Sequence, residues 1–184
     1  VRNHTDRLDF VIHSVAYADR EDLQRDFIGT SRANFAMAMD ISAYSLVAVA
    51  REAAALMPAG GSIVTMTYFG SEKVVPNYNV MGVAKAALEA SARYLASDLG
   101  PRAIRVNCIS AGPLRTLSAS AIAGARAIGR FVEKVSPMRR NIDGSDVGNA
   151  ALYLVSDWAS AVTGEVLHVD AGCNIMGMGL VEKD

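Results

Sequence analysis

The chain has 184 residues, with 18 Lys+Arg against 19 Asp+Glu; 51% of its residues are hydrophobic and 20% are charged. This composition suits one domain with a sizeable core and excludes a disordered chain. A net charge of −1 without a basic stripe argues against nucleic acid or a membrane surface as partner, because both attract clustered Lys and Arg. Charges, Gly or Pro interrupt the apolar runs within about a dozen residues, too short a length to cross a bilayer.

The two cysteines, Cys108 and Cys173, have no Cys or His at ligand spacing, so we expect neither a metal site nor a disulfide. The opening residues VRNHTDRLDFV lack the pattern of a secretory signal. These features predict a cytoplasmic protein.

Short apolar segments alternate with helical patterns along the chain. Segments typical of strands covered on both faces are Leu8–Val15, Ser62–Thr67, Ile104–Ile109 and Gly164–Asp170. Helical patterns cover Ser31–Met57, Asn77–Leu99, 118–135 and Asp146–Ser156, the last capped by Asp143 or Ser145. This alternation predicts an α/β domain with a doubly wound parallel sheet and helices on both faces.

Ligands of such sheets bind beyond the carboxyl ends of the strands, which directs attention to residues 13–18, 67–70 and 110–116. A dinucleotide site also needs a Gly-rich turn between a strand and a helix. Gly60 and Gly61 precede a strand instead, and no helical pattern follows Gly177 and Gly179. The sequence therefore predicts no pyrophosphate cradle within these residues.

Tyr78 and Lys85 are seven residues apart on a predicted helix, so they share one face about 10 Å apart along the axis. The Lys85 side chain points back toward the phenol, where its charge favours the phenolate and its N–H groups suit ribose hydroxyls. Gly82, between them, is expected to leave a slot for a ribose. Such a pair also occurs by chance on exposed helices, but Tyr68 and the Pro76-Asn77 helix start favour a site.

The segments YNVMGVAKAALEASARYLASDLGP, IRVNCISAGPLRTLSAS and GEVLHVDAGCNI resemble the bacterial enoyl-acyl-carrier-protein reductases, a divergent branch of the short-chain dehydrogenase/reductases. The HSVAYA segment and the Tyr-x9-Tyr-x6-Lys spacing of Tyr68, Tyr78 and Lys85 separate this branch from the 3-oxoacyl reductases. The likeness extends from Leu8 to about Met176.

This resemblance implies a Rossmann-like fold and the reduction of trans-2-enoyl thioesters on acyl-carrier protein during fatty-acid elongation. The implied cofactor is NADH, with NADPH not excluded, and the implied assembly is a homotetramer. Residues 1–184 correspond to the C-terminal part of one reductase domain, N-terminally incomplete without the Gly-rich portion, and are expected to be inactive alone. Ala-rich outer helix faces fit the tetramer; the residues are Ala84, Ala86, Ala87, Ala90, Ala92 and Ala96.

The resemblance also implies a role for individual residues. Tyr78 hydrogen-bonds the thioester carbonyl, Lys85 holds the nicotinamide ribose, and Tyr68 lines the acyl pocket with a supporting catalytic role. The implied cofactor-binding residues are Ser14, Val15, Lys85, Leu114, Arg115, Thr116, Leu117 and Ser118. The implied substrate-binding residues are Ala18, Tyr68, Met81 and Ile122. The Ala- and Gly-rich stretch Leu117–Val135 is expected to form a mobile substrate-binding lid.

Simpler interpretations stand beside these roles. Thr116 suits a helix cap, His13 a hydrogen-bonded core histidine and Met81 ordinary packing. For the whole chain, the alternatives are a 3-oxoacyl or other carbonyl reductase of the same superfamily, and a catalytically inert oligomerising fragment.

Overall fold

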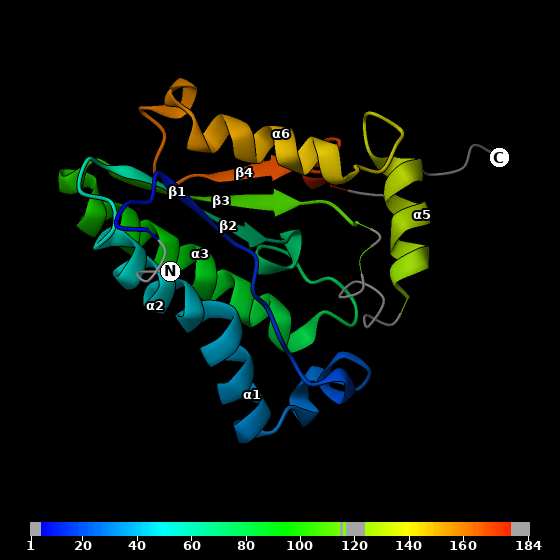
Figure 1. Cartoon of the computed structure of the whole chain (residues 1–184). Coiled ribbons are helices and arrows are strands. Elements are labelled where there is room, and N and C mark those ends of the chain that lie inside the picture. The colour runs from blue at the N-terminus through cyan, green and yellow to red at the C-terminus, as the bar shows by residue number, and fades with distance from the viewer. Residues whose placement is uncertain (1–4, 115, 117–123, 178–184) are drawn as a thin grey trace.

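A four-stranded parallel sheet forms the centre of the computed structural model, which describes residues 5–114, 116 and 124–177 (Figure 1). Its strands are β1 (Phe10–His13), β2 (Gly61–Thr67), β3 (Ile104–Ala111) and β4 (Val166–Val169), and they lie in this order across the sheet. All three neighbouring pairs are parallel. The predicted Rossmann-like α/β fold is confirmed.

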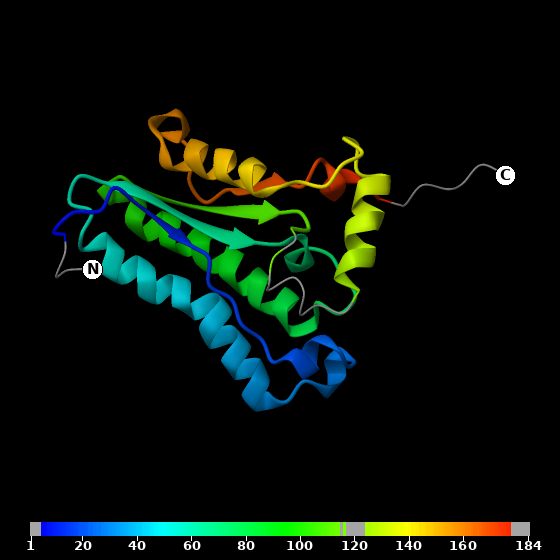
Figure 2. The same ribbon diagram turned by 45° about the vertical axis from the view of Figure 1, so that its right-hand side comes forward.

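The helices cover both faces of this sheet (Figure 2). They are α1 (Arg32–Met39), α2 (Ser45–Ala54), α3 (Asn79–Leu99), α5 (Ala125–Val135) and α6 (Gly144–Val155). A π-helical turn, Asp40–Tyr44, joins α1 to α2. The 3₁₀ turns are η1 (Arg20–Leu23), η2 (Phe27–Gly29), η4 (Phe69–Ser71), η5 (Gly100–Arg102), η6 (Asp157–Ala159) and η7 (Cys173–Ile175).

The helix ends follow local chemistry. Asp143 caps α6, and a reciprocal hydrogen bond from its own backbone N–H to the Asp146 carboxylate completes a capping box. The helix expected from Asn77 begins at Asn79 instead, because Asn77 has a left-handed φ of 66°. Tyr78 therefore occupies the N-cap position of α3 rather than its first turn.

The core has two layers, one on each face of the sheet. Ile63 and Val106 pack with Leu46 and Leu88 on the side of α2 and α3. Their strand neighbours Val64 and Ile109 pack with Leu154 on the side of α6. Because successive side chains of a strand point to opposite faces, each strand contributes to both layers.

β1 differs from the prediction of a strand covered on both faces. Val11 packs against the α2 and α3 layer, but Phe10 and Ile12 are 49% and 46% exposed. α6 packs on β2, β3 and β4, so these two side chains lie beyond its cover. β1 is hydrogen-bonded to β2 along one edge and ends the sheet within the described part of the chain.

The continuous stretch Arg32–Ala54 is long and apolar enough, by length and composition alone, to cross a membrane, with a mean hydropathy of 1.3 over its best window. This differs from the expectation that every apolar run is too short. Its inner side supplies Leu46, Ala50 and Ala53 to the core against α3, and 28% of that window is buried.

The prediction of an Ala-rich outer face on α3 is wrong for half of its residues. Ala84, Ala92 and Ala96 are buried beneath the sheet. Periodicity alone did not show which side of this evenly apolar helix faces inward. The side chains on its outer side include Val83, Arg93 and Tyr94.

Candidate active site

Tyr68 and Tyr78 lie together at the carboxyl end of β2. Tyr68 follows the strand directly, and Tyr78 is buried at the start of α3. Their rings meet edge to face, with centroids 4.9 Å apart and an interplanar angle of 73°. Leu23, Met81 and the partly buried Ala18 pack around them, and Val75 completes the cluster. The structure thus brings together Ala18, Tyr68, Tyr78 and Met81, as predicted, and adds Leu23 and Val75.

Two glycines allow the Tyr78 ring to reach this position. A Cβ on Gly70 would lie 2.4 Å from Cδ1 of Tyr78, and a Cβ on Gly82 would lie 2.6 Å from the Gly70 carbonyl oxygen. The slot expected at Gly82 for a ribose is therefore wrong. The backbone of η4 fills that space and holds the ring from behind.

Lys85 points into the protein beneath the sheet. Its ammonium donates a hydrogen bond of 2.8 Å to the carbonyl oxygen of Met66 in β2. Burial lowers the pKa of Lys85 to about 8, while Cys108 and Glu89 act in the opposite direction. Lys85 is therefore mostly an ammonium at neutral pH and loses its charge in the mildly alkaline range.

The Tyr78 phenol is kept in its neutral form. Burial raises the pKa of Tyr78, and Tyr68 and Glu89 raise it further. The expectation that Lys85 favours the phenolate is therefore wrong in this structure, because desolvation of the phenolate dominates. A neutral phenol is a hydrogen-bond donor, so Tyr78 is suited to stabilise negative charge on a ligand oxygen.

His13 is a hydrogen-bonded core histidine, in agreement with the simpler interpretation. Its Nδ1 lies 2.9 Å from Thr65 Oγ1 and its Nε2 2.9 Å from Ser45 Oγ. Ser45 donates its proton to the Ile41 carbonyl, so it accepts from Nε2–H of His13. Burial and then the charge of Lys85 lower the pKa of His13, which keeps this ring neutral.

Ser42 fixes the loop that carries the predicted cofactor residues, and sequence reasoning missed it. Its hydroxyl accepts from the backbone N–H of Tyr17 at 2.8 Å and donates to the Tyr17 carbonyl at 2.9 Å. Ser14 and Val15 precede Tyr17 in this loop and are exposed at the end of β1. Ser42 lies in the π-helical turn, and a π-helical turn within a helix has no clear sequence signature.

The chain after β3 also reaches this edge. Tyr68, Ser110, Pro113, Val132 and Cys173 are among the residues that line a narrow cavity there. Leu114 is half-buried and Thr116 is exposed. The other predicted site residues of this segment, Arg115, Leu117, Ser118 and Ile122, lie outside the described residues, as does the first part, 117–123, of the predicted lid. The rest of that lid contains the helix α5 (Ala125–Val135).

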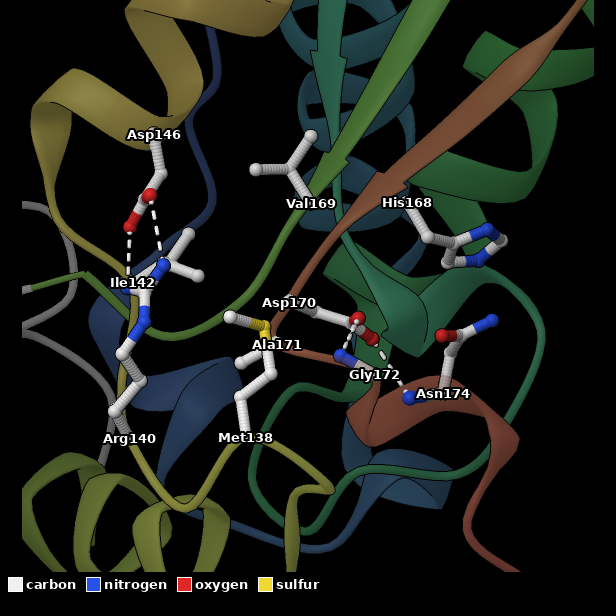
Figure 3. A pocket seen from close by; sticks show the side chains of 10 residues that line it. All are labelled: Met138, Arg140, Ile142, Asp146, His168, Val169, Asp170, Ala171, Gly172 and Asn174. Atoms are coloured by element: carbon white, nitrogen blue, oxygen red, sulfur yellow. Dashed lines mark hydrogen bonds and ion pairs between the residues drawn. The ribbon is translucent and has the colours of Figure 1, made fainter.

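A larger cavity of about 310 Å³ lies beyond β4 (Figure 3). Its polar groups are already paired: Arg140 donates to both oxygens of Asp146, and Asp170 accepts from the backbone N–H groups of Gly172 and Asn174. Within residues 5–114, 116 and 124–177, no group of three or more His, Cys, Asp or Glu side chains is arranged to hold a metal. Both cysteines are free thiols.

Comparisons with known proteins agree with the earlier resemblance. The family described as "Enoyl-(Acyl carrier protein) reductase" matches residues 1–174. The enoyl-[acyl-carrier-protein] reductase [NADH] of Nostoc sp. is 57% identical over 97% of this chain, which covers 69% of that protein. The [NADPH] enzyme of Staphylococcus aureus is 58% identical over 90% of this chain, which covers 64% of that protein.

A solved structure shows the same fold. The enoyl-acyl-carrier-protein reductase of Anaplasma phagocytophilum, in complex with NAD, superposes with a TM-score of 0.92 at 49% identity, over 99% of this chain and 67% of that one. The chain thus spans about two thirds of the length of the proteins it matches. With a family match over residues 1–174 and close agreement in fold, the chain belongs to the enoyl-acyl-carrier-protein reductase family.

Proposed function

We propose that this protein reduces trans-2-enoyl thioesters, carried on acyl-carrier protein, to acyl thioesters in fatty-acid elongation. The observation that supports this most directly is the buried, neutral phenol of Tyr78 against Tyr68 at the carboxyl edge of the sheet. The relatives named above carry the same activity in their names. A cytoplasmic location belongs to this proposal, since both cysteines are free thiols.

The residues present fit one half of a nicotinamide dinucleotide. The hydroxyls of Ser14 and Thr116 and the ammonium of Lys85 are donors suited to ribose and phosphate oxygens, and they lie on segments at or near the edge where such sheets bind ligands. The described residues contain no Gly-rich turn that leads from a strand into a helix. We therefore assign the nicotinamide half to Ser14, Val15, Lys85, Leu114, Arg115, Thr116, Leu117 and Ser118, with NADH as cofactor and NADPH as the alternative.

A bound nicotinamide would supply a hydride to the β-carbon of the enoyl thioester, and a proton from solvent would complete the reduction at the α-carbon. Tyr78 donates a hydrogen bond to the thioester carbonyl and stabilises the enolate oxygen that forms there; a donor of this kind contributes on the order of 3 kcal/mol. Tyr68 packs on Tyr78 and shields it from water, with Ala18 and Met81 beside them for the acyl chain. Ile122, which lies outside the described residues, is assigned to the same chain by the family resemblance. We assign the nicotinamide ribose to Lys85, whose ammonium also donates to the Met66 carbonyl.

We assign the binding surface for the carrier protein to α5. Arg126, Arg130 and Lys134 recur every four residues and are exposed, so they form a cationic row on one side of this helix. The overall composition does not reveal this row, because the whole chain is almost neutral. An acidic carrier surface fits such a row, and Val132 on the other side of α5 lines the narrow cavity beside Tyr68.

We further propose that residues 1–184 form the C-terminal part of the reductase domain and that residues beyond this range complete the cofactor site. Support comes from the half-exposed Phe10 and Ile12 on the terminal strand β1 and from the two-thirds coverage of the relatives. Titration of NADH into the 184-residue chain by calorimetry tests this. We expect no binding at micromolar concentrations; micromolar affinity would show that the described half suffices.

A homotetramer is also part of the proposal. Exposed apolar side chains on α3 and around α6 support contacts between copies, with Tyr94 on α3, Leu152 on α6 and an 84% exposed Trp158 just beyond it. Light scattering at micromolar concentration should give the mass of four subunits. A monomer mass contradicts this assembly.

The reaction itself is tested with two short thioesters and the full-length protein. Oxidation of NADH should accompany reduction of crotonyl thioester, and acetoacetyl thioester should be a poor substrate. Preference for acetoacetyl thioester would favour a 3-oxoacyl reductase. If the full-length protein neither binds NADH nor reduces either thioester, a catalytically inert, oligomerising protein is the better description.

A further inference from the structure

Glu89 is a buried carboxylate that the proposed reaction does not use. It follows Lys85 by four residues on α3, so both side chains lie on the same side of the helix, and they are 7% and 6% exposed. A carboxylate is rarely this deeply buried unless other groups stabilise its charge. Because Glu89 lies one helical turn from Lys85, its charge can act on the Lys85 ammonium.

Thr67 holds Glu89 in place. The Thr67 hydroxyl, at the end of β2, donates a hydrogen bond of 2.5 Å to Oε1 of Glu89. The backbone carbonyl of the preceding residue, Met66, accepts a hydrogen bond of 2.8 Å from the ammonium of Lys85. Two successive residues of β2 thus hold the carboxylate and the ammonium at neighbouring points beneath the sheet.

Among the described residues, Glu89 and Cys108 are the acidic groups that act on Lys85. His13, from β1, is a neutral ring with both nitrogens hydrogen-bonded. Cys108, from β3, remains a thiol because burial raises its pKa to about 12. The charged residues of the neighbouring helix α2, Arg51 and Glu52, are exposed to solvent.

We propose that Glu89, fixed by Thr67, is a positioning residue that keeps Lys85 charged. A nearby negative charge favours the ammonium of Lys85 and so retains its proton. The action of Lys85 on cofactor and substrate rests on the proposed function. The effect of Glu89 on the protonation of Lys85 does not depend on it.

The direct test is an NMR titration of the lysine ε-methylene groups in the full-length protein, without cofactor or substrate. Lys85→Met identifies the Lys85 signal. In Glu89→Gln the pKa of Lys85 should fall by at least about 0.5 relative to the parent, as expected for loss of a nearby opposite charge. Glu89→Asp should return it toward the parent value. An unchanged or higher pKa in Glu89→Gln overturns the proposal.

Two further variants separate this effect from a general change in charge or folding. Asp98→Asn removes a negative charge from the exposed end of α3 and should leave the pKa of Lys85 unchanged. A fall equal to that of Glu89→Gln would contradict a specific role of Glu89. If Glu89→Gln does not fold, Thr67→Val decides, because it removes the hydroxyl that fixes the carboxylate. It should lower the same pKa, and no change overturns the proposal.

Activity then supplies a second readout. The alkaline limit of turnover on crotonyl thioester should move to lower pH in Glu89→Gln by as much as the pKa of Lys85 falls. A merely structural role would lower turnover equally at every pH, and a fixed alkaline limit contradicts the positioning role. Absence of reductase activity in the parent would instead refute the proposed function and leave the NMR result to decide the role of Glu89.

Discussion

The Tyr68 ring meets the Tyr78 ring edge to face, with 4.9 Å between their centroids. Tyr68 is therefore part of the apolar surroundings that keep Tyr78 neutral. Of the two residues, Tyr78 is the one at the N-cap of α3, with its ring against Gly70. The two hydroxyls should therefore differ in importance.

Tyr78→Phe should lower kcat on crotonyl thioester by about 100-fold or more, which corresponds to roughly 3 kcal/mol, because the hydroxyl acts on charge that develops in the transition state. Binding of NADH to the full-length protein should change little. Tyr68→Phe is the matched control and should retain most activity. A loss of less than about twofold in Tyr78→Phe would show that the phenol has no such role.

Lys85→Met should change how stability depends on pH. The pKa of Lys85 is about 8 in the folded protein, below its ordinary value of 10.5, so between these two pH values the unfolded chain binds more protons than the folded one. Stability of the parent therefore gains a contribution of up to about 3 kcal/mol as pH rises through this window, and Lys85→Met should lack it. Urea unfolding at pH 7.5 and at pH 9.5, relative to the parent, measures the difference. If the difference in unfolding free energy between Lys85→Met and the parent were the same at both pH values, Lys85 would not be desolvated.

Gly82→Ala should displace η4 and the Tyr78 ring, because its Cβ would lie 2.6 Å from the backbone oxygen of Gly70, so that the backbone there must shift. We expect a loss of about 1–3 kcal/mol in unfolding free energy and a large drop in kcat. Gly148→Ala in α6 is the control: a Cβ there meets nothing within 4 Å, and helix propensity predicts a gain of about 0.5–1 kcal/mol. Thermal unfolding of both variants separates the cost of the close contact at Gly82 from the gain in helix propensity. An equal change in stability in both variants would rule out the close contact at Gly82.

Reversal of the cationic row on α5, with Arg126→Glu and Arg130→Glu, should raise KM for a carrier-bound substrate by about tenfold and make it insensitive to salt. KM for crotonyl coenzyme A, a small thioester, should change far less. Steady-state kinetics on both substrates at two salt concentrations make the comparison. An equal rise for both substrates would place the effect in the acyl site rather than at a carrier surface.

The sequence by itself determined the order of strands and helices, because hydrophobic periodicity and the Gly and Pro stops are local properties of the chain. The Tyr-x9-Tyr-x6-Lys spacing likewise sufficed to select Tyr68, Tyr78 and Lys85 and to indicate the family. The cap of α6 could be narrowed to Asp143 or Ser145 for the same reason, and the structure assigns it to Asp143.

Tertiary structure decided the features that depend on segments distant in sequence. Gly82 receives the Gly70 carbonyl instead of a ribose, and burial, not the charge of Lys85, sets the protonation of Tyr78. Ser42 reaches Tyr17 across 25 positions and Thr67 reaches Glu89 across 22, so no local pattern could pair them. The exposure of Phe10 and Ile12 has the same origin: their alternation with Val11 and His13 is visible in the sequence, but whether a helix covers them depends on where α6 packs.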